Sequence, residues 1–173
     1  MSAREMPKFD TGLREVGDNL YAYLQWDGGW GISNAGFVDG GDGLLVIDAL
    51  MAPSMAHSFV DAMRGVSGAP FRQLVNTHSH ADHTNGNQFI EGAEIVAHEN
   101  CLKEMEEAAA VRAARPPGDR GPRPAWIQES WWQDLADVEP PLPTVTFPGD
   151  LTLHYGNTEV QLLYGGPAHT TGD

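Results

Sequence analysis

Three of the seven histidines of this chain and one carboxylate fall within six consecutive positions, from His78 to His83. Imidazole nitrogens suit zinc and most first-row divalent metals, and a carboxylate adds a hard oxygen ligand. In extended backbone, side chains two positions apart point to the same side, so His78, His80 and Asp82 share one face until a bend brings in His83. The stretch therefore predicts a metal site with these four residues as candidate ligands.

The residues on either side of this stretch indicate where it lies in a fold. Leu74-Val75-Asn76 reads as the end of a buried strand, and Asn85-Gly86-Asn87 reads as a turn that opens a short helix. A loop at the carboxyl end of a strand is a usual place for chemistry. The alternative is a polar loop with incidental histidines or an adventitious metal-binding tract. Residue types, spacing and the preceding strand all agree with a built metal site, which disfavours that alternative.

A second motif lies far downstream, at Gly166-Pro167-Ala168-His169-Thr170-Thr171-Gly172-Asp173. Together with His-x-His-x-Asp-His after Asn76-Thr77, it resembles the metallo-β-lactamase superfamily. The resemblance implies an α/β fold, an αβ/βα sandwich of two mixed β-sheets with outer helices. It also implies that further strands, a metal-bridging Asp or its substitute, and a final His follow Asp173. We therefore expect residues 1–173 to be a single domain of this type, truncated at its C-terminus and lacking the C-terminal part.

The resemblance also implies a ligand set. His78, His80 and His169 form a three-histidine site, an arrangement that leaves a fourth tetrahedral position for water, and Asp82 and His83 begin a second site. We expect one or two zinc ions (Zn²⁺), with iron or manganese as alternatives. Zinc lowers the pKa of its bound water to roughly 7, which provides a hydroxide nucleophile at neutral pH.

The expected activity is that of a zinc-dependent hydrolase that uses metal-bound hydroxide on a carbonyl-type bond, in a thioester, lactone, ester or β-lactam. Asp82 is the candidate catalytic residue, because it can orient or deprotonate the attacking water. Two alternatives stay open: an iron-dependent, persulfide-type oxidoreductase and a noncatalytic metal-binding fragment. The flavodiiron branch of the superfamily is disfavoured, since it places Glu where this chain has His80.

Residues outside the two motifs are further candidates for the site. The apolar run Leu44–Ile47 ends in Asp48, which can accept the second ring N–H of a ligand histidine or simply cap a helix or turn. The loop 29–35 resembles the family's hairpin that overhangs the metals, so Trp30 and Asn34 are candidate substrate contacts. For Trp30, packing on the core is the alternative.

An insertion interrupts the regular pattern at residues 115–143. Residues 114–124 hold four prolines and two glycines and predict no regular structure. Trp131 follows in a short helix-like stretch and is a candidate wall of an apolar substrate pocket, or else packs its aromatic face on the domain. The rest of the chain predicts helices at 53–66 and 100–114 and strands at 13–16, 20–24, 32–38, 44–47, 71–75, 94–97, 144–147, 151–155 and 159–164.

The composition of the chain limits the kinds of partner that it is expected to bind. Ten Lys and Arg against 24 Asp and Glu give a formal charge of −14, which disfavours nucleic acid and anionic membranes as partners and leaves a small-molecule substrate. The N-terminus has no apolar signal-peptide core and no segment suits a membrane span, so we expect a cytoplasmic protein. The single cysteine, Cys101, predicts a buried, inert thiol. Glu104, Glu106 and Glu107 indicate a solvated helix face, and the oligomeric state stays open.

Overall fold

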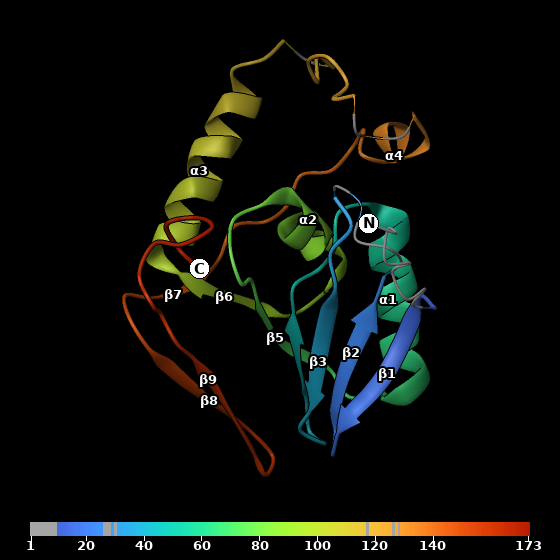
Figure 1. Cartoon of the computed structure of the whole chain (residues 1–173), viewed down its shortest axis with the longest axis vertical. Coiled ribbons are helices and arrows are strands. Elements are labelled where there is room, and N and C mark those ends of the chain that lie inside the picture. The colour runs from blue at the N-terminus through green and yellow to red at the C-terminus, as the bar shows by residue number, and fades with distance from the viewer. Residues whose placement is uncertain (1–9, 26–28, 30, 117, 126, 128) are drawn as a thin grey trace, which may run out of the picture.

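The computed structural model describes residues 10–25, 29, 31–116, 118–125, 127 and 129–173. Within them the chain forms a seven-stranded sheet, in the order β1 to β7, and a two-stranded sheet of β8 and β9 (Figure 1). Strands β1 to β4 are antiparallel neighbours, whereas β4 to β7 run parallel. The strands are β1 (Gly12–Gly17), β2 (Leu20–Leu24), β3 (Ala35–Asp39), β4 (Leu44–Ile47), β5 (Phe71–Val75), β6 (Glu94–His98), β7 (Val145–Phe147), β8 (Leu151–Tyr155) and β9 (Thr158–Leu162).

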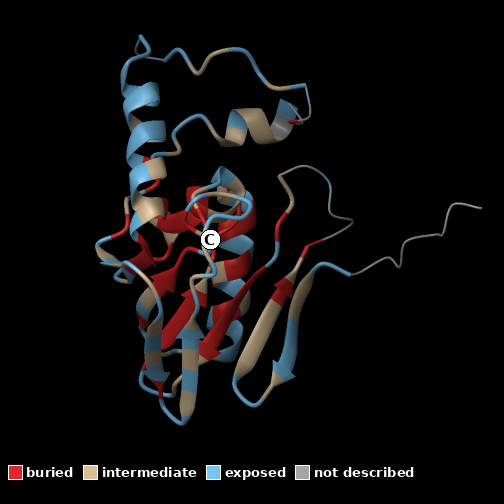
Figure 2. Ribbon diagram, turned by 60° about the vertical axis from the view of Figure 1, so that its left-hand side comes forward, coloured by how far each residue is buried: buried red, intermediate tan, exposed pale blue. Residues whose placement is uncertain are grey.

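Alternate residues of the central strands face opposite sides of the large sheet, as the pleat requires. One set packs with helix α1 (Pro53–Val66) in the main hydrophobic cluster: Phe37, Leu44, Val46, Leu74 and Ile95. Their sequence neighbours pack with Tyr155 of β8 in a second cluster: Val38, Leu45, Val75 and Val96. Figure 2 shows the buried residues concentrated in these central strands. Helix α1 therefore covers one face of the sheet, and the hairpin β8–β9 packs on the other.

The parallel strands place the chemistry-bearing residues at one edge of the sheet. Strand β4 ends just before Asp48, and β5 ends just before Asn76 and the histidine stretch. The backbone N–H of Asp48 donates to Val75 O at 2.9 Å, and that of Asn76 donates to Val96 O at 3.0 Å. Because the carboxyl ends of parallel strands meet at the same edge, the predicted ligands and Asp48 lie side by side.

Short helices complete this edge. Helix α2 (Ala81–Thr84) and the 3-10 helix η1 (Asn85–Phe89) follow the histidine stretch, and α3 (Glu99–Ala113) follows β6. The insertion carries α4 (Glu129–Asp134). Ser54 donates to the Asp134 carboxylate from its backbone N–H (3.0 Å) and its hydroxyl (2.6 Å), so α4 docks at the start of α1. The N-cap residue of α1 supplies no side-chain cap of its own.

The sequence predictions agree with this fold in most respects. The α/β class is confirmed, and the helix predicted at 53–66 has those bounds. The described residues of segment 114–124 form neither helix nor strand, as its prolines indicate. The second sheet was expected to be mixed, but in the part of the chain that is described it is an antiparallel pair. None of the described helices combines the length and the hydropathy needed to cross a bilayer.

Candidate metal centre

Two loops bring three histidines together. His78 and His80 follow β5, and His169 lies in the loop after β9. One ligand nitrogen from each lies within 4.8 Å of the other two, and His169 Nε2 is 3.0 Å from His80 Nδ1. Three imidazoles that converge in this way are a donor set that zinc uses, with one tetrahedral position left open. The residues present therefore fit a divalent metal ion.

His78 is the buried member of the triad, whereas His80 and His169 are exposed. Burial lowers the pKa of His78 below its usual value, and His83, His80 and His169 lower it further, against an opposing effect of Asp48. The imidazole is therefore neutral at pH 7, which is the form that binds a metal.

Asp48 connects the end of β4 to the histidine stretch. Its Oδ1 accepts the Thr77 backbone N–H at 2.8 Å, and its Oδ2 accepts the Thr77 hydroxyl at 2.8 Å. The same Oδ2 is 2.7 Å from His83 Nδ1, so the other ring nitrogen, Nε2, points away from Asp48. Asp48 does not cap helix α1, whose N-cap residue is Ala52. Its backbone has a positive φ of 58°, a conformation that Asp and Asn tolerate better than most residues.

His83 and Asp82 are the predicted ligands of a second metal site. His83 Nε2 lies 3.4 Å from Asp82 Oδ2. Burial lowers the pKa of His83, but hydrogen bonds and charge from Asp48 and Asp82 outweigh it and raise the pKa to about 9. Burial raises the pKa of Asp82, but its interactions with His83 bring it below the usual value. A metal ion held by His83 and Asp82 would take the place of the proton on His83 Nε2.

A buried pair of asparagines closes the base of this loop. Asn76 Nδ2 donates to Asn87 Oδ1 at 3.0 Å, and Asn87 Nδ2 donates back to Asn76 Oδ1 at 2.8 Å. Gly86, which directly precedes Asn87 in the chain, packs so tightly that a Cβ at this position would lie 1.8 Å from the Ala49 carbonyl oxygen. The two ends of the histidine stretch are therefore fixed by the core. Sequence reasoning missed this pair, because each Asn alone indicates only a strand end or a turn.

Three residues outside the two motifs were predicted to contact substrate: Trp30, Asn34 and Trp131. Trp30 lies outside the described residues. Asn34 is exposed, and its Oδ1 accepts the Gln25 backbone N–H at 3.0 Å. The neighbouring Ser33 donates its hydroxyl to the Asp82 carbonyl at 2.5 Å, which joins this loop to the histidine stretch. Trp131 is half-buried against the main hydrophobic cluster.

One carboxylate that sequence reasoning assigned to a solvated helix face lies at the site instead. Glu104 of α3 accepts hydrogen bonds from Ser79 in the first loop and from Thr171 in the second. No local pattern distinguishes Glu104 from Glu106 and Glu107, which are exposed on the same helix.

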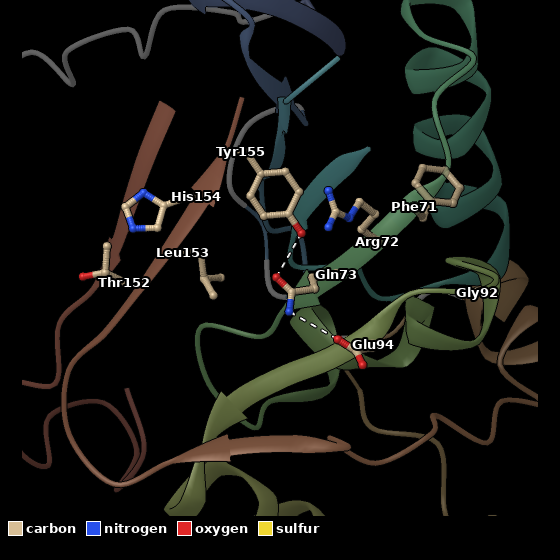
Figure 3. A pocket seen from close by; sticks show the side chains of 9 residues that line it. All are labelled: Phe71, Arg72, Gln73, Gly92, Glu94, Thr152, Leu153, His154 and Tyr155. Atoms are coloured by element: carbon tan, nitrogen blue, oxygen red, sulfur yellow. Dashed lines mark hydrogen bonds between the residues drawn. The ribbon is translucent and has the colours of Figure 1, made fainter. Parts of the chain in front are cut away.

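A separate groove of about 490 Å³ lies between β8 and strands β5 and β6 (Figure 3). Its floor carries a hydrogen-bonded chain: the Tyr155 hydroxyl donates to Gln73 Oε1 at 2.9 Å, and Gln73 Nε2 donates to Glu94 Oε2 at 3.4 Å. None of the described metal-site residues lines this groove. The groove is therefore distinct from the candidate metal centre.

Comparisons with known proteins agree with this geometry. A family model for the metallo-beta-lactamase superfamily matches residues 28–173. The structure is similar to a metallo-beta-lactamase from Pontibacter korlensis, with a TM-score of 0.69 and 16% sequence identity over 94% of this chain and 64% of the other. It is also similar to a double mutant of the sec-alkyl sulfatase PisA1, with a TM-score of 0.65 and 20% identity over 94% of this chain and 28% of the other.

A curated relative gives a sequence match of limited extent. Over 77 residues the chain is 32% identical to a linear primary-alkylsulfatase from Pseudomonas sp.. The match covers 44% of this chain and 11% of that protein, so the chain spans only a small part of the relative's length.

Proposed function

Because the family match covers most of its length, this chain belongs to the metallo-beta-lactamase superfamily, and we propose that it works as a metal-dependent hydrolase. The observation that carries the proposal is the convergence of His78, His80 and His169 from two loops. The acidic Asp82 and the imidazole of His83 beside the triad supply two further donors. Zinc is the proposed ion, because imidazole nitrogens dominate the donor set.

A divalent ion bound at the triad supplies a Lewis acid and makes a coordinated water more acidic. The chain's own residues supply the rest. His78, His80 and His169 would hold the ion through three imidazole nitrogens, a ligand set that leaves a fourth position for water or substrate. Asp48 holds His83 through Nδ1 and thereby orients Nε2 toward the second site.

Asp82 is the proposed catalytic residue. Its pKa is below the usual value, so the carboxylate is ionised at neutral pH and can accept a hydrogen bond or a proton from an attacking water. The hydrogen bond from Ser33 to its backbone carbonyl holds this residue in place. Asp82→Asn keeps the size of the side chain but removes its basicity, and is expected to lower hydrolysis by about 10²–10⁴-fold.

Two classes of substrate are worth testing. Carbonyl-type bonds, in thioesters, lactones, esters and β-lactams, fit attack by an activated water with an ion to polarise the carbonyl. Alkyl sulfate esters are the second class, because the curated relative with 32% identity over 77 residues is a linear primary-alkylsulfatase. Either class is a small molecule.

The proposal is tested by metal content and by a substrate panel. Elemental analysis of the purified protein is expected to find zinc, and a His78→Ala, His80→Ala double variant is expected to lose it. The wild type is then assayed on a thioester, a lactone, a chromogenic β-lactam and a linear alkyl sulfate. Equal metal content in both proteins contradicts the metal site. If the protein instead binds iron and consumes oxygen with a persulfide as substrate, it is an oxidoreductase and not a hydrolase.

A further inference from the structure

The loop that carries His169 lies mostly at the surface. His169 itself is exposed, and so are most residues from 163 to 171. Its neighbour Asp173 folds the loop on itself, because the Asp173 carboxylate accepts the backbone N–H groups of Thr170 (2.8 Å) and Ala168 (3.2 Å). This local turn shapes the loop but does not join it to the other metal-site residues.

The first turns of α3 supply that connection. Asn100 Nδ2 donates to the Thr171 carbonyl at 2.9 Å, and the Tyr164 hydroxyl donates to the same oxygen at 3.0 Å. Gly172 lies so close to α3 that a Cβ would be 2.3 Å from the Cys101 backbone nitrogen. Figure 1 shows the C-terminal loop against the start of α3. The loop is thus docked on one end of one helix.

Glu104 reaches from this helix to both metal-binding loops at once. Its Oε1 accepts the Thr171 backbone N–H at 3.0 Å and the Thr171 hydroxyl at 2.7 Å. Its Oε2 accepts the Ser79 hydroxyl at 2.5 Å. Ser79 lies between His78 and His80, and Thr171 lies two residues after His169. One carboxylate therefore bridges the segments that carry all three histidines.

Ser79 and Thr171 both donate hydrogen bonds to Glu104, so this position requires a side chain that accepts them. Glu106 and Glu107 on the same helix are exposed, whereas Glu104 is half-buried. Burial raises the pKa of Glu104, but the hydrogen bonds from Ser79 and Thr171 lower it more, to below its usual value. Glu104 accepts three hydrogen bonds and donates none, which a carboxylate does and an amide does only in part.

We propose that Glu104 is a positioning residue that fixes His169 relative to His78 and His80 and thereby sets the affinity and geometry of the metal centre. The inference rests on the proposed metal function. Glu104 is not one of the proposed ligands; it acts through the Ser79 hydroxyl and through the backbone N–H and hydroxyl of Thr171. Outer partners of this kind typically change metal affinity by about 10–100-fold when they are removed.

The test compares Glu104→Ala with Glu107→Ala, a matched variant that removes one carboxylate from an exposed position of the same helix. Zinc affinity is measured by competition with a chromophoric chelator, and cobalt-substituted protein gives a visible spectrum that reports ligand geometry. Glu104→Ala is expected to weaken zinc binding by about 10–100-fold and to shift the cobalt spectrum at saturation. Glu107→Ala is expected to match the wild type in both.

The conservative variant Glu104→Gln sharpens the test. Its amide oxygen still accepts from Thr171, and its NH₂ group donates to the Ser79 hydroxyl, which accepts as well as donates. Glu104→Gln is therefore expected to restore most of the affinity and the wild-type cobalt spectrum. If Glu104→Ala does not fold, Ser79→Ala breaks the same bridge from the other side and is expected to weaken zinc binding about fivefold, the size of one hydrogen bond.

The outcomes separate this inference from the proposed function. A wild type that binds no metal contradicts both. A wild type that binds zinc, with Glu104→Ala or its substitute Ser79→Ala equal to Glu107→Ala, overturns the role of Glu104 and leaves the metal site intact. A fall in affinity that Glu104→Gln does not restore, with an unchanged cobalt spectrum, also overturns it, because the effect is then one of charge and not of position.

Discussion

The two loops that form the metal triad are held in different ways. The loop from Asn76 to Asn87 continues a buried strand, and its base is closed by a buried pair of amides. His78 in this loop is 8% exposed. The loop that carries His169 is mostly exposed, and polar contacts to the first turns of α3 hold it.

Because of this difference, the free energy of unfolding and the affinity for a metal ion are expected to respond differently to changes in the two loops. A change in the first loop disturbs the core on which α1 and the central strands pack. A change in the second loop disturbs its docking on α3, through hydrogen bonds and the packing of Gly172, and is expected to move His169 more than it destabilises the fold.

The largest effect is expected from Gly86→Ala in the first loop. The new Cβ would lie 1.8 Å from the Ala49 carbonyl oxygen and 3.0 Å from the Ala56 Cβ, so backbone must shift. Overpacking of this kind is expected to cost about 3 kcal/mol of unfolding free energy, which chemical denaturation measures. The affinity of this variant for zinc is expected to fall together with its stability.

Gly65→Ala is the control for that experiment. A Cβ at Gly65 meets nothing within 4 Å, and the residue lies inside α1. Alanine there is expected to stabilise the protein by about 0.5–1 kcal/mol, because glycine is the poorer helix former. If both variants have the same stability, the first loop is not fixed by the core as described.

A smaller effect on stability, but a clear one on the metal, is expected from Gly172→Ala in the second loop. The Cβ would lie 2.3 Å from the Cys101 nitrogen and would push the loop off α3. Zinc affinity is expected to fall by about tenfold or more, the size of an outer-partner effect. The unfolding free energy of the metal-free protein is expected to fall by less than in Gly86→Ala, because the mostly exposed loop can move away from α3. Calorimetric zinc titration and denaturation measure the two quantities.

Gly165→Ala, in the same loop, has no atom within 4 Å of its new Cβ and serves as the matched variant. It is expected to bind zinc like the wild type. A Gly172→Ala protein that keeps wild-type zinc affinity would show that docking on α3 does not position His169.

The smallest effect is expected from Asp48→Asn, which replaces the carboxylate that holds the first loop at Thr77 and His83 by an amide of the same shape. Asparagine tolerates the positive φ of 58° at this position and can still accept the Thr77 N–H. His83 loses its charged partner, so binding of a second metal equivalent is expected to weaken about tenfold while the first equivalent is unchanged. Equal loss of both equivalents would contradict the separation of the two sites.

The elements around the site could be predicted from sequence because their signals are local. Pro53 near the helix start and the apolar spacing of Met55, Phe59 and Met63 define α1. Likewise, the apolar run before Asp48 indicates where one strand ends, and the histidine spacing indicates where another strand ends and which polar residues follow it. Parallel pairing of β4 and β5 then brings them together.

The rest depends on contacts between distant segments. Glu104 has partners 25 and 67 residues away, at Ser79 and Thr171, and nothing in its helical neighbourhood indicates either. The reciprocal pairing of Asn76 and Asn87 depends on the return of the chain after α2. Trp131 contacts the main hydrophobic cluster, and its role as a wall of a substrate pocket stays a prediction.

Zinc titration of His169→Ala tests whether both loops contribute to the metal centre, because His169 is the triad member that the exposed loop supplies. His154→Ala is the control, since His154 is an exposed histidine on β8 outside the triad. Isothermal titration is expected to show that His169→Ala binds zinc at least about 100-fold more weakly than the wild type, the loss of one of three protein ligands. His154→Ala is expected to bind like the wild type. Identical isotherms for His169→Ala and the wild type would contradict a metal centre built from the two loops.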